Sequence, residues 1–198
     1  LTGQEMPAGF TLNNVYLSRV SGNGFVAELW ASDVALNNQR YQLRLFDPGD
    51  HYLTLEYNQV PHLYSTQARI LYEGPNPSVL RIPDSIQTAL ETAPLTPAGD
   101  LTRSAIIDEN VHQRDIAVSR ETGRVAFRWT PSAAWDIRLE YSNENRTGSV
   151  PFGTALNGFN TIEIPAPVSY TTQTFNASAQ YTGRLAQNRN WSLAVAYN

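Results

Sequence analysis

The chain has 198 residues, a length that suits one all-β domain, and a formal net charge of −4. It contains no cysteine, which excludes disulfides, thiolate metal sites and a Cys-x-x-Cys-His haem attachment in this chain. All 14 basic residues are arginine, so a P-loop lysine and a lysine Schiff base are excluded too. The acidic balance gives no basis for nucleic-acid binding, which needs a basic patch.

Alternating apolar and polar residues predict β-strands along much of the first 57 residues. A first, less regular strand is expected over residues 11–20, and Ser21-Gly22-Asn23-Gly24 is a strong turn signal. After a second strand, a hairpin is predicted from residues 41–45 and 53–57 around the turn Asp47-Pro48-Gly49-Asp50. The period of two indicates strands with one apolar and one polar face.

The alternation resumes in the second half of the chain. Residues 115–120 form a strand, a turn is expected at Glu121-Thr122-Gly123, and further strands follow, so about nine strands are predicted in all. The apolar sides of these later strands carry Val125, Phe127, Trp129, Trp135, Ile137, Leu139, Tyr141, Phe175, Ala177, Ala179, Tyr181, Trp191, Leu193, Val195 and Tyr197.

Two long connections are predicted, at about 59–112 and 145–169. The first contains six prolines and has helical character only from Asp84 to Thr92. A connection of this length is far beyond common loop lengths, so it is functional or partly folded on its own. If all nine strands cross a membrane, the number of strands between the connections is odd and the connections lie on opposite sides.

Aromatic residues on three strands recur six positions apart, which corresponds to roughly 20 Å along a strand. Two aromatic girdles around the apolar band of a transmembrane β-barrel would have this spacing. Aromatic packing in the core of a soluble β-sandwich would have it as well. The spacing alone does not decide between these two all-β classes; we expect an antiparallel transmembrane β-barrel, present in part with about nine strands and two long loops, and keep a soluble β-sandwich as the alternative. The pairs are Trp135 and Tyr141, Phe175 and Tyr181, and Trp191 and Tyr197.

Charges lie in the middle of the polar strand faces, at Arg124, Arg128, Arg138 and Glu140, with Arg44 and Glu56 on earlier strands. In a barrel these side chains would point into an aqueous lumen, where they could contact a partner and form cross-strand ion pairs. On a soluble protein they would be a solvated outer face. Charged residues make up only 16% of the chain, against about a quarter in ordinary soluble domains, which favours the lumen.

Little in the sequence indicates catalysis or metal binding. His51, His62 and His112 share no metal-ligand spacing, and no Gly-x-Ser-x-Gly elbow supports a serine nucleophile. Asp136 and Glu140 share a strand face, but this pattern is common on any polar face. We therefore expect a protein that is not an enzyme and that holds no metal or cofactor of its own.

Three segments in order resemble motifs of the MtrB/PioB family of decahaem-associated outer-membrane proteins. Residues 164–172, Ile-Pro-Ala-Pro-Val-Ser-Tyr-Thr-Thr, resemble its Leu-Pro-x-Pro-Val-Asp-Tyr-x-Thr signature, with Ser169 in place of Asp. Residues 53–62 look like its strand ending in Pro-His, and residues 130–141 look like its Pro and Trp hairpin. The residues that carry the resemblance are Pro61, His62, Pro131, Trp135, Tyr141, Pro165, Pro167, Tyr170 and Thr172.

The resemblance implies a bacterial outer-membrane sleeve that holds and insulates a multihaem c-type cytochrome for electron transfer across the membrane. Residues 1–198 would be one β-barrel domain, the N-terminal portion or a fragment of a larger barrel. A periplasmic cytochrome is the expected partner, an extracellular one is a second candidate, and lipid is the outer contact. Haem would belong to the partner. The N-terminal Cys pair of some members is missing here. The alternatives are a small self-contained barrel or pore, and a soluble β-sandwich binding module.

Overall fold

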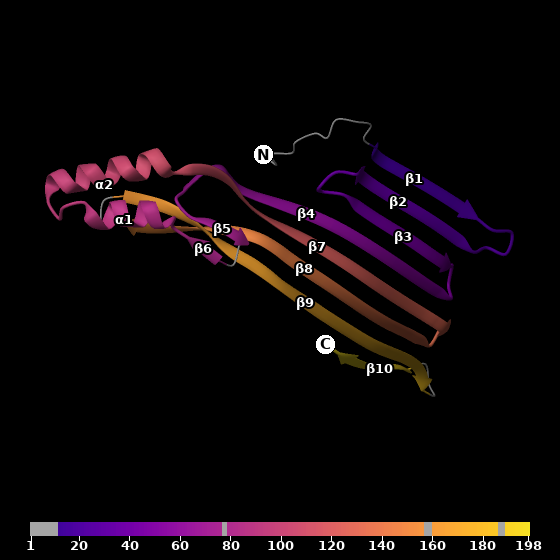
Figure 1. The fold of residues 1–198 in the computed structure, drawn as a ribbon. Coiled ribbons are helices and arrows are strands. Elements are labelled where there is room, and N and C mark those ends of the chain that lie inside the picture. Colours follow the sequence, from indigo (N-terminus) through magenta and orange to yellow (C-terminus); the bar gives the residue numbers. More distant parts are fainter. Residues whose placement is uncertain (1–11, 77–78, 157–159, 186–188) are drawn as a thin grey trace. The chain divides into compact units, whose positions relative to one another are not determined.

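The described chain consists of ten β-strands and two helices in a computed structural model (Figure 1). The structure describes residues 12–76, 79–156, 160–185 and 189–198. Thr11, where the first strand was expected to begin, lies outside these ranges. The elements in chain order are β1 (Leu12–Val20), β2 (Val26–Val34), β3 (Arg40–Asp47), β4 (His51–Ile70), β5 (Glu73–Asn76), β6 (Val79–Arg81), α1 (Asp84–Thr92), α2 (Pro97–Asn110), β7 (His112–Ser132), β8 (Trp135–Leu156), β9 (Asn160–Leu185) and β10 (Arg189–Tyr197).

The main sheet is an antiparallel meander in the order β1-β2-β3-β4-β7-β8-β9-β10, while β5 and β6 form a separate two-stranded sheet. The hairpin predicted between residues 41 and 57 is confirmed, with Tyr41 opposite Tyr57. At its turn the Asp50 amide donates to the Asp47 carbonyl over 3.1 Å. Gly49 has a φ of 90°, which glycine adopts without strain.

The main sheet has eight strands, where the sequence predicted about nine, because β7 is continuous. The turn predicted at residues 121–123 is wrong, since these residues lie inside β7. Neighbouring strands hold β7 on both sides: Arg124 pairs with Glu56 of β4 and with Glu140 of β8. Pairing with two strands overrides the local turn preference, and the glycine is tolerated within the strand.

The two connections lie at the same end of the strands, so the expectation that they lie on opposite sides is wrong. Between them the chain runs out along β7 and back along β8, which is an even number of strands. Both connections belong to one compact unit, which includes residues 61–119 and 146–169. The error follows directly from counting β7 as two strands.

The long strands also extend further than the alternation indicated. β4 continues to Ile70, and residues 145–156 and 160–169 lie in β8 and β9 rather than in an irregular connection. About 9–11 residues suffice for a strand to cross a bilayer, so strands of 20 and 26 residues are longer than a membrane span requires. Alternation is strict only where the two faces of a strand meet different surroundings, so it did not mark the remaining parts of these strands.

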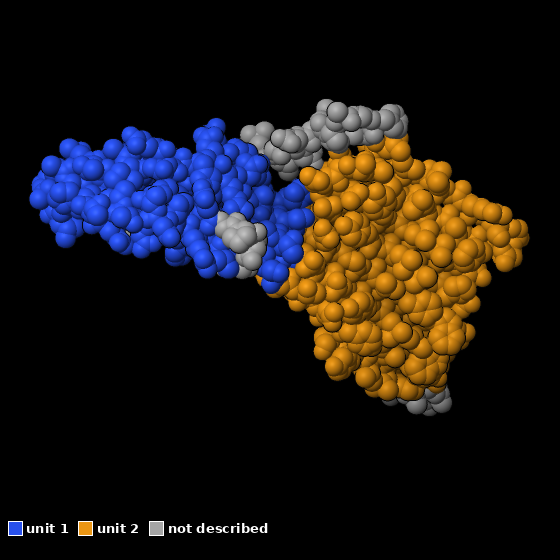
Figure 2. Space-filling model, viewed as in Figure 1, with its two compact units in different colours: residues 1–3, 61–119, 146–169 blue, residues 4–60, 120–145, 170–198 orange. Residues whose placement is uncertain are grey.

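The described chain divides into two compact units (Figure 2). Unit 1 holds the helices, the β5–β6 hairpin and the adjoining ends of β4, β7, β8 and β9. Unit 2 holds β1, β2, β3 and β10 with the remaining parts of those four strands. None of the helices in the described parts of the chain is long and apolar enough to cross a membrane.

Unit 1 contains a conventional hydrophobic core. Leu71, just after β4, and Ile107 of α2 are 1% and 4% exposed, and partly buried apolar residues, among them Ile86 and Leu90 of α1, pack against them. Burial of this kind stabilises the unit by removing apolar surface from water. The buried hydrophobic residues of unit 1 are Ala68, Ile70, Leu71, Ala93, Ile107, Ile116 and Val118.

The predicted helix over residues 84–92 is confirmed as α1, but the sequence did not predict α2. Clustered prolines argue against a helix there, yet Pro97 occupies the first turn, where its fixed φ favours helix. Thr96 caps this turn, because its hydroxyl accepts a hydrogen bond of 3.2 Å from the Gly99 amide. Pro97 therefore starts a helix instead of ending one.

Arg103 fixes the bend between the two helices. Arg103 is 3% exposed, and its guanidinium donates hydrogen bonds to the carbonyl oxygens of Ala93 at 3.0 Å and Pro94 at 2.9 Å. It also pairs with Asp100 one turn earlier in α2. Carbonyls at a helix end lack partners within the helix, so a buried cation that binds them closes the end of α1.

Unit 2 is a single layer of sheet. Among its described residues, Ala31 is the one hydrophobic side chain that is buried. A β-sandwich requires a second sheet packed on the first, whereas every described strand of unit 2 belongs to the same eight-stranded sheet. The soluble β-sandwich alternative is therefore wrong.

Candidate functional site

The sheet of unit 2 has two chemically distinct faces. Residues directly opposite each other on neighbouring strands point to the same side, so the register extends each face across the sheet. On the side that we call the apolar face, Leu17, Leu29, Leu43 and Leu55 form one row over four strands. The opposite side, the polar face, carries Glu28, Arg44, Glu56, Arg124, Arg128, Asp136, Arg138 and Glu140.

Large hydrophobic side chains are exposed on the apolar face. On β10, Leu193 and Val195 are 56% and 63% exposed. Leu139 of β8 and Phe175 of β9 extend the same surface. A contiguous apolar surface of this extent is unfavourable in water and is the expected outer surface of a membrane barrel.

One row of aromatic residues borders the apolar face near the start of β8, the end of β9 and the start of β10. Trp135 and Tyr181 have ring centroids 4.9 Å apart, and Tyr181 and Trp191 are 5.2 Å apart. The three rings come from β8, β9 and β10 in turn. Amphipathic rings of this kind favour the boundary between lipid and water.

A second row lies toward the other end of the same strands. Phe175 and Tyr197 are 6.3 Å apart across β9 and β10, and Tyr41 and Tyr57 are 6.3 Å apart across β3 and β4. Tyr141 occupies the corresponding part of β8. The two rows agree with the six-residue spacing in the sequence, and aliphatic side chains lie between them. This is the pattern of two aromatic girdles around an apolar band.

Trp191 of the first row lies against a glycine. Gly183 is its direct partner on β9, and a Cβ at this glycine would approach the indole Nε1 to 2.5 Å. The ring thus covers the glycine, which supplies no side chain of its own to pack. A side chain at position 183 would displace the ring from its place in the row.

Ion pairs run across the strands on the polar face. Arg124 of β7 binds Glu140 of β8 at 2.6 Å and Glu56 of β4 at 3.1 Å. Gln42 of β3 donates to the same Glu56. The side chains of this group are 18–37% exposed, so the charges remain accessible to water or to a partner. Each pair on such a surface contributes little stability, about 0–1 kcal/mol.

A second group lies nearer the β7–β8 turn. Arg128 donates to both carboxylate oxygens of Asp136, at 3.1 and 3.0 Å, and Arg138 does the same at 3.1 and 2.7 Å. One carboxylate thus joins two guanidinium groups, and the group keeps one excess positive charge. The side chain of Arg138 is 60% exposed and available for further contacts.

All four predicted partner-contact residues therefore lie on the polar face. Arg124 and Glu140 bind each other, and Arg128 and Arg138 meet through Asp136. The cross-strand ion pairs expected for a lumen are present. Whether a partner contacts these residues stays a prediction. Pairing with Glu56 could not be foreseen, because it joins strands separated by the helical connection.

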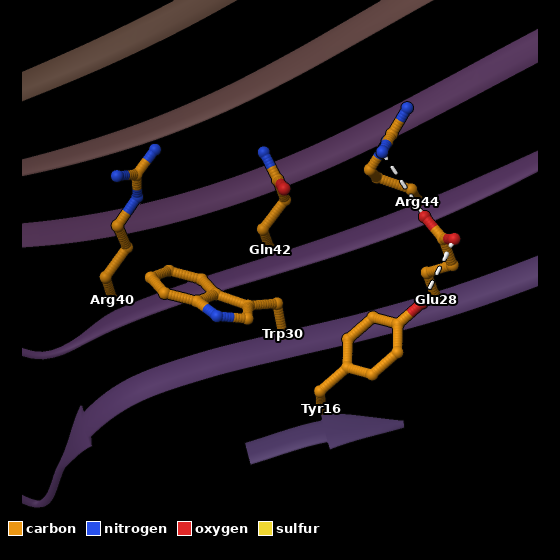
Figure 3. A pocket seen from close by; sticks show the side chains of 6 residues that line it. All are labelled: Tyr16, Glu28, Trp30, Arg40, Gln42 and Arg44. Carbon is orange, nitrogen blue, oxygen red and sulfur yellow. Dashed lines mark hydrogen bonds and ion pairs between the residues drawn. The ribbon is translucent and has the colours of Figure 1, made fainter. Parts of the chain in front are cut away.

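A shallow pocket opens on the polar face of β1, β2 and β3 (Figure 3). Glu28 forms its acidic side, since it pairs with Arg44 at 3.3 Å and accepts a hydrogen bond of 3.2 Å from the Tyr16 hydroxyl. Arg40 forms its basic side and lies over the ring of Trp30, with the guanidinium carbon 5.4 Å from the ring centroid. The alternation placed Arg44 on a polar strand face, but it did not single out Tyr16, Glu28, Trp30 or Arg40.

The residues of the three sequence motifs lie near the ends of the unit 2 strands. The limits between the units fall at Pro61 on β4 and between Ser169 and Tyr170 on β9. His62 is exposed and its ring is 4.4 Å from that of Tyr64. Further motif residues on β9 are Pro165, which is buried, and Pro167, Tyr170 and Thr172, which are exposed. Those of the β7–β8 hairpin are Pro131, Trp135 and Tyr141, which are all exposed.

An antiparallel meander with a girdled apolar face and an ion-paired polar face defines the outer-membrane β-barrel class. Residues 8–198 match the family model described as outer membrane beta-barrel porin, MtrB/PioB, and the chain belongs to this family. The resemblance drawn from the three motifs is thereby confirmed, as is the bacterial outer membrane as its location. A porin family is not an enzyme family. A comparison with curated proteins found no match.

Proposed function

We propose that this chain forms part of a porin-like sleeve that holds a multihaem c-type cytochrome and insulates it from lipid during electron transfer across the outer membrane. The observation that carries the proposal is the contrast between the faces of the unit 2 sheet. Exposed hydrophobic residues between two aromatic rows suit lipid contact, and the cross-strand ion pairs on the other side suit a wet or protein-filled interior.

The ion pairs support a sleeve for a protein in particular. The first group, around Arg124, has one excess negative charge and the second, around Asp136, has one excess positive charge, so the two groups together are balanced, with three arginines and three carboxylates. A balanced, hydrogen-bonded surface can face a protein without leaving isolated charges desolvated. Porin-like barrels are wide enough to enclose more than side chains when the strand number is large.

The chain itself offers no covalent haem attachment of the Cys-x-x-Cys-His type, because it has no cysteine. The electron carriers would therefore belong to a periplasmic cytochrome, with an extracellular cytochrome as a second candidate partner. The role of this chain would be to exclude lipid and to fix the position of the partner. Insulation follows from the single layer of sheet, whose outer face is apolar.

The direct test is to isolate the full-length protein from outer membranes in mild detergent and to record its visible absorption spectrum. The proposal predicts c-type haem bands in constant ratio to the protein through gel filtration. A preparation without haem that conducts ions in planar bilayers would contradict the sleeve and support a simple pore. The result does not depend on any single residue.

A further inference from the structure

We propose that the pocket of Figure 3 is an anchoring site that binds a carboxylate group of the protein partner through Arg40, with Trp30 and Tyr16 as its aromatic walls. This inference rests on the proposed function, because it specifies where the partner is held. The carboxylate could be an aspartate or glutamate side chain or a haem propionate. The site lies wholly within unit 2.

The first argument is the charge of Arg40. In the sheet register it faces Ser32 of β2 and Asn58 of β4, which are both neutral. Among the ion pairs of the described chain, Arg44 has Glu28 and Arg124 has Glu56 and Glu140, whereas Arg40 has none. Its guanidinium is therefore a cation on the polar face that the neighbouring strands do not neutralise.

The second argument is the shape of the site. Trp30 lies between Tyr16 and Gln42 in one cross-strand row, and the guanidinium of Arg40 lies over its ring. This cation–π contact favours a position of the guanidinium beside the ring and uses none of its N–H donors, which can bind a carboxylate in bidentate fashion. The ring thus prepares the guanidinium for one kind of ligand.

The third argument is the exposure of aromatic surface beside charged groups on the polar face. Tyr16 is 60% exposed, although its hydroxyl is fixed by Glu28. Trp, Tyr and Arg are the residues that most often dominate the energy of protein interfaces. Their cluster on one side of the ion pairs gives the partner an apolar contact beside a charged one.

The hydrogen bonds around the pocket also explain why the site would select an acidic group over a basic one. Gln42 donates to Glu56, and Glu28 is already bound to Arg44 and Tyr16, so the local carboxylates are occupied. A basic group of a partner would have to share Glu28 or Glu56 with these donors, whereas a carboxylate would find Arg40, which has no ion pair among the described residues. The complementary surface of the partner is therefore acidic at this point.

The test uses the full-length protein in its native membrane with the variants Arg40→Gln and Arg40→Lys. The matched control is Arg120→Gln, because Arg120 is an exposed arginine of β7 with a long pair of 3.9 Å to Glu144. The measurement is the haem retained per protein after a moderate salt wash. We expect about tenfold less haem for Arg40→Gln, an intermediate loss for Arg40→Lys and no change for the control. Equal retention in all variants would overturn the inference.

Spectroscopy distinguishes the two carboxylate sources. If a haem propionate is bound, Arg40→Gln shifts the reduction potential of one haem in the retained fraction. If an acidic side chain is bound, the potentials stay the same and only retention falls. Either result supports the site, because both require the loss of retention.

A photo-crosslinking residue at Ser32, which is opposite Arg40, separates this inference from the proposed function. Crosslinks to an acidic segment of another chain support the anchoring site, even if the isolated wild-type protein carries no haem and the sleeve is contradicted. Crosslinks confined to this chain, with or without haem, overturn the site. If haem retention does not depend on Arg40, the proposed sleeve function stands and the proposed anchoring site is wrong.

Discussion

The two units of this chain obtain their stability from different surroundings. In unit 1, Leu71 and Ile107 are buried in one cluster with apolar side chains such as Ile86 and Leu90, as in a water-soluble protein. In unit 2, Leu193, Val195 and Tyr197 are more than half exposed, and Ala31 is the one buried hydrophobic residue among those described. The strands β4, β7, β8 and β9 contribute to both units.

This comparison shows that the apolar side chains of one strand can be buried in protein at one end and exposed on the apolar face at the other. Where β7 belongs to unit 1, Ile116 and Val118 are buried within the protein. Where it belongs to unit 2, Val125 and Trp129 are each 43% exposed on the apolar face. A bilayer replaces the missing core for the second part. Changes in unit 1 should therefore act through packing and changes in unit 2 through contact with lipid or the lumen.

The largest effect is expected from Leu71→Ala in unit 1. Removal of a buried leucine side chain leaves a cavity and should cost about 2–5 kcal/mol. Hydrogen exchange of the α1 and α2 amides in the full chain measures the loss, and amides of β1 and β2 should not change. The control is Leu101→Ala, since Leu101 is 74% exposed and should be near neutral. Equal effects of the two variants would contradict a packed core.

Ala179→Arg should be the most damaging change on the apolar face. Ala179 is opposite Val195, between the aromatic rows, and an arginine there would face lipid at a cost of about 2–4 kcal/mol. Gln180→Arg is the matched control, because the next residue of β9 points to the polar face. Unfolding by urea in lipid vesicles compares the two. The assignment of faces fails if Gln180→Arg is the more destabilising change.

Arg103→Ala should have an intermediate effect that stays within unit 1. The carbonyls of Ala93 and Pro94 would lose a buried charged donor, which is expected to cost about 1.5–3 kcal/mol. Faster hydrogen exchange at the α1–α2 bend would report it. Arg69→Ala serves as the control, because its pair with Asp108 is exposed on both sides and such pairs contribute about 0–1 kcal/mol.

The smallest effect on stability is expected from Arg124→Gln. Its two ion pairs are partly exposed, so the loss should be about 1 kcal/mol or less and should shrink as salt is added. Urea unfolding at two salt concentrations tests this. A loss as large as that of Ala179→Arg, and independent of salt, would show that the polar face is buried from water.

The sequence predicts the membrane part of this fold well, for a physical reason. Lipid on one side and a polar interior on the other impose a strict alternation, so the 41–57 hairpin and the aromatic pairs such as Trp135 and Tyr141 were visible. The polar positions Arg124 and Glu140 follow from the same alternation. Their binding to each other shows that the two side chains lie on the same face of the sheet.

Unit 1 was predicted less well, because its residues face protein on more than one side. The strand ends beyond Pro61 and Asn145 have no strict period, and Pro97 looked like a helix breaker although it begins α2. The turn expected at Gly123 failed because pairing with β4 and β8 is not a local property. The pocket at Arg40 depends on register and could not be located from alternation alone.

The central claim is that the two faces of the unit 2 sheet meet different surroundings, lipid on one side and an aqueous or protein-filled interior on the other. Neighbouring residues of β9 test it most directly: Ala177 points to the apolar face and Ser178 to the polar face. Each is replaced singly by cysteine, which this chain lacks, and spin-labelled in the outer membrane. We predict that the label at 177 is accessible to oxygen and protected from a water-soluble nickel reagent. The label at 178 should be less accessible to oxygen and more accessible to the nickel reagent. Equal access of the nickel reagent to both labels would contradict the account.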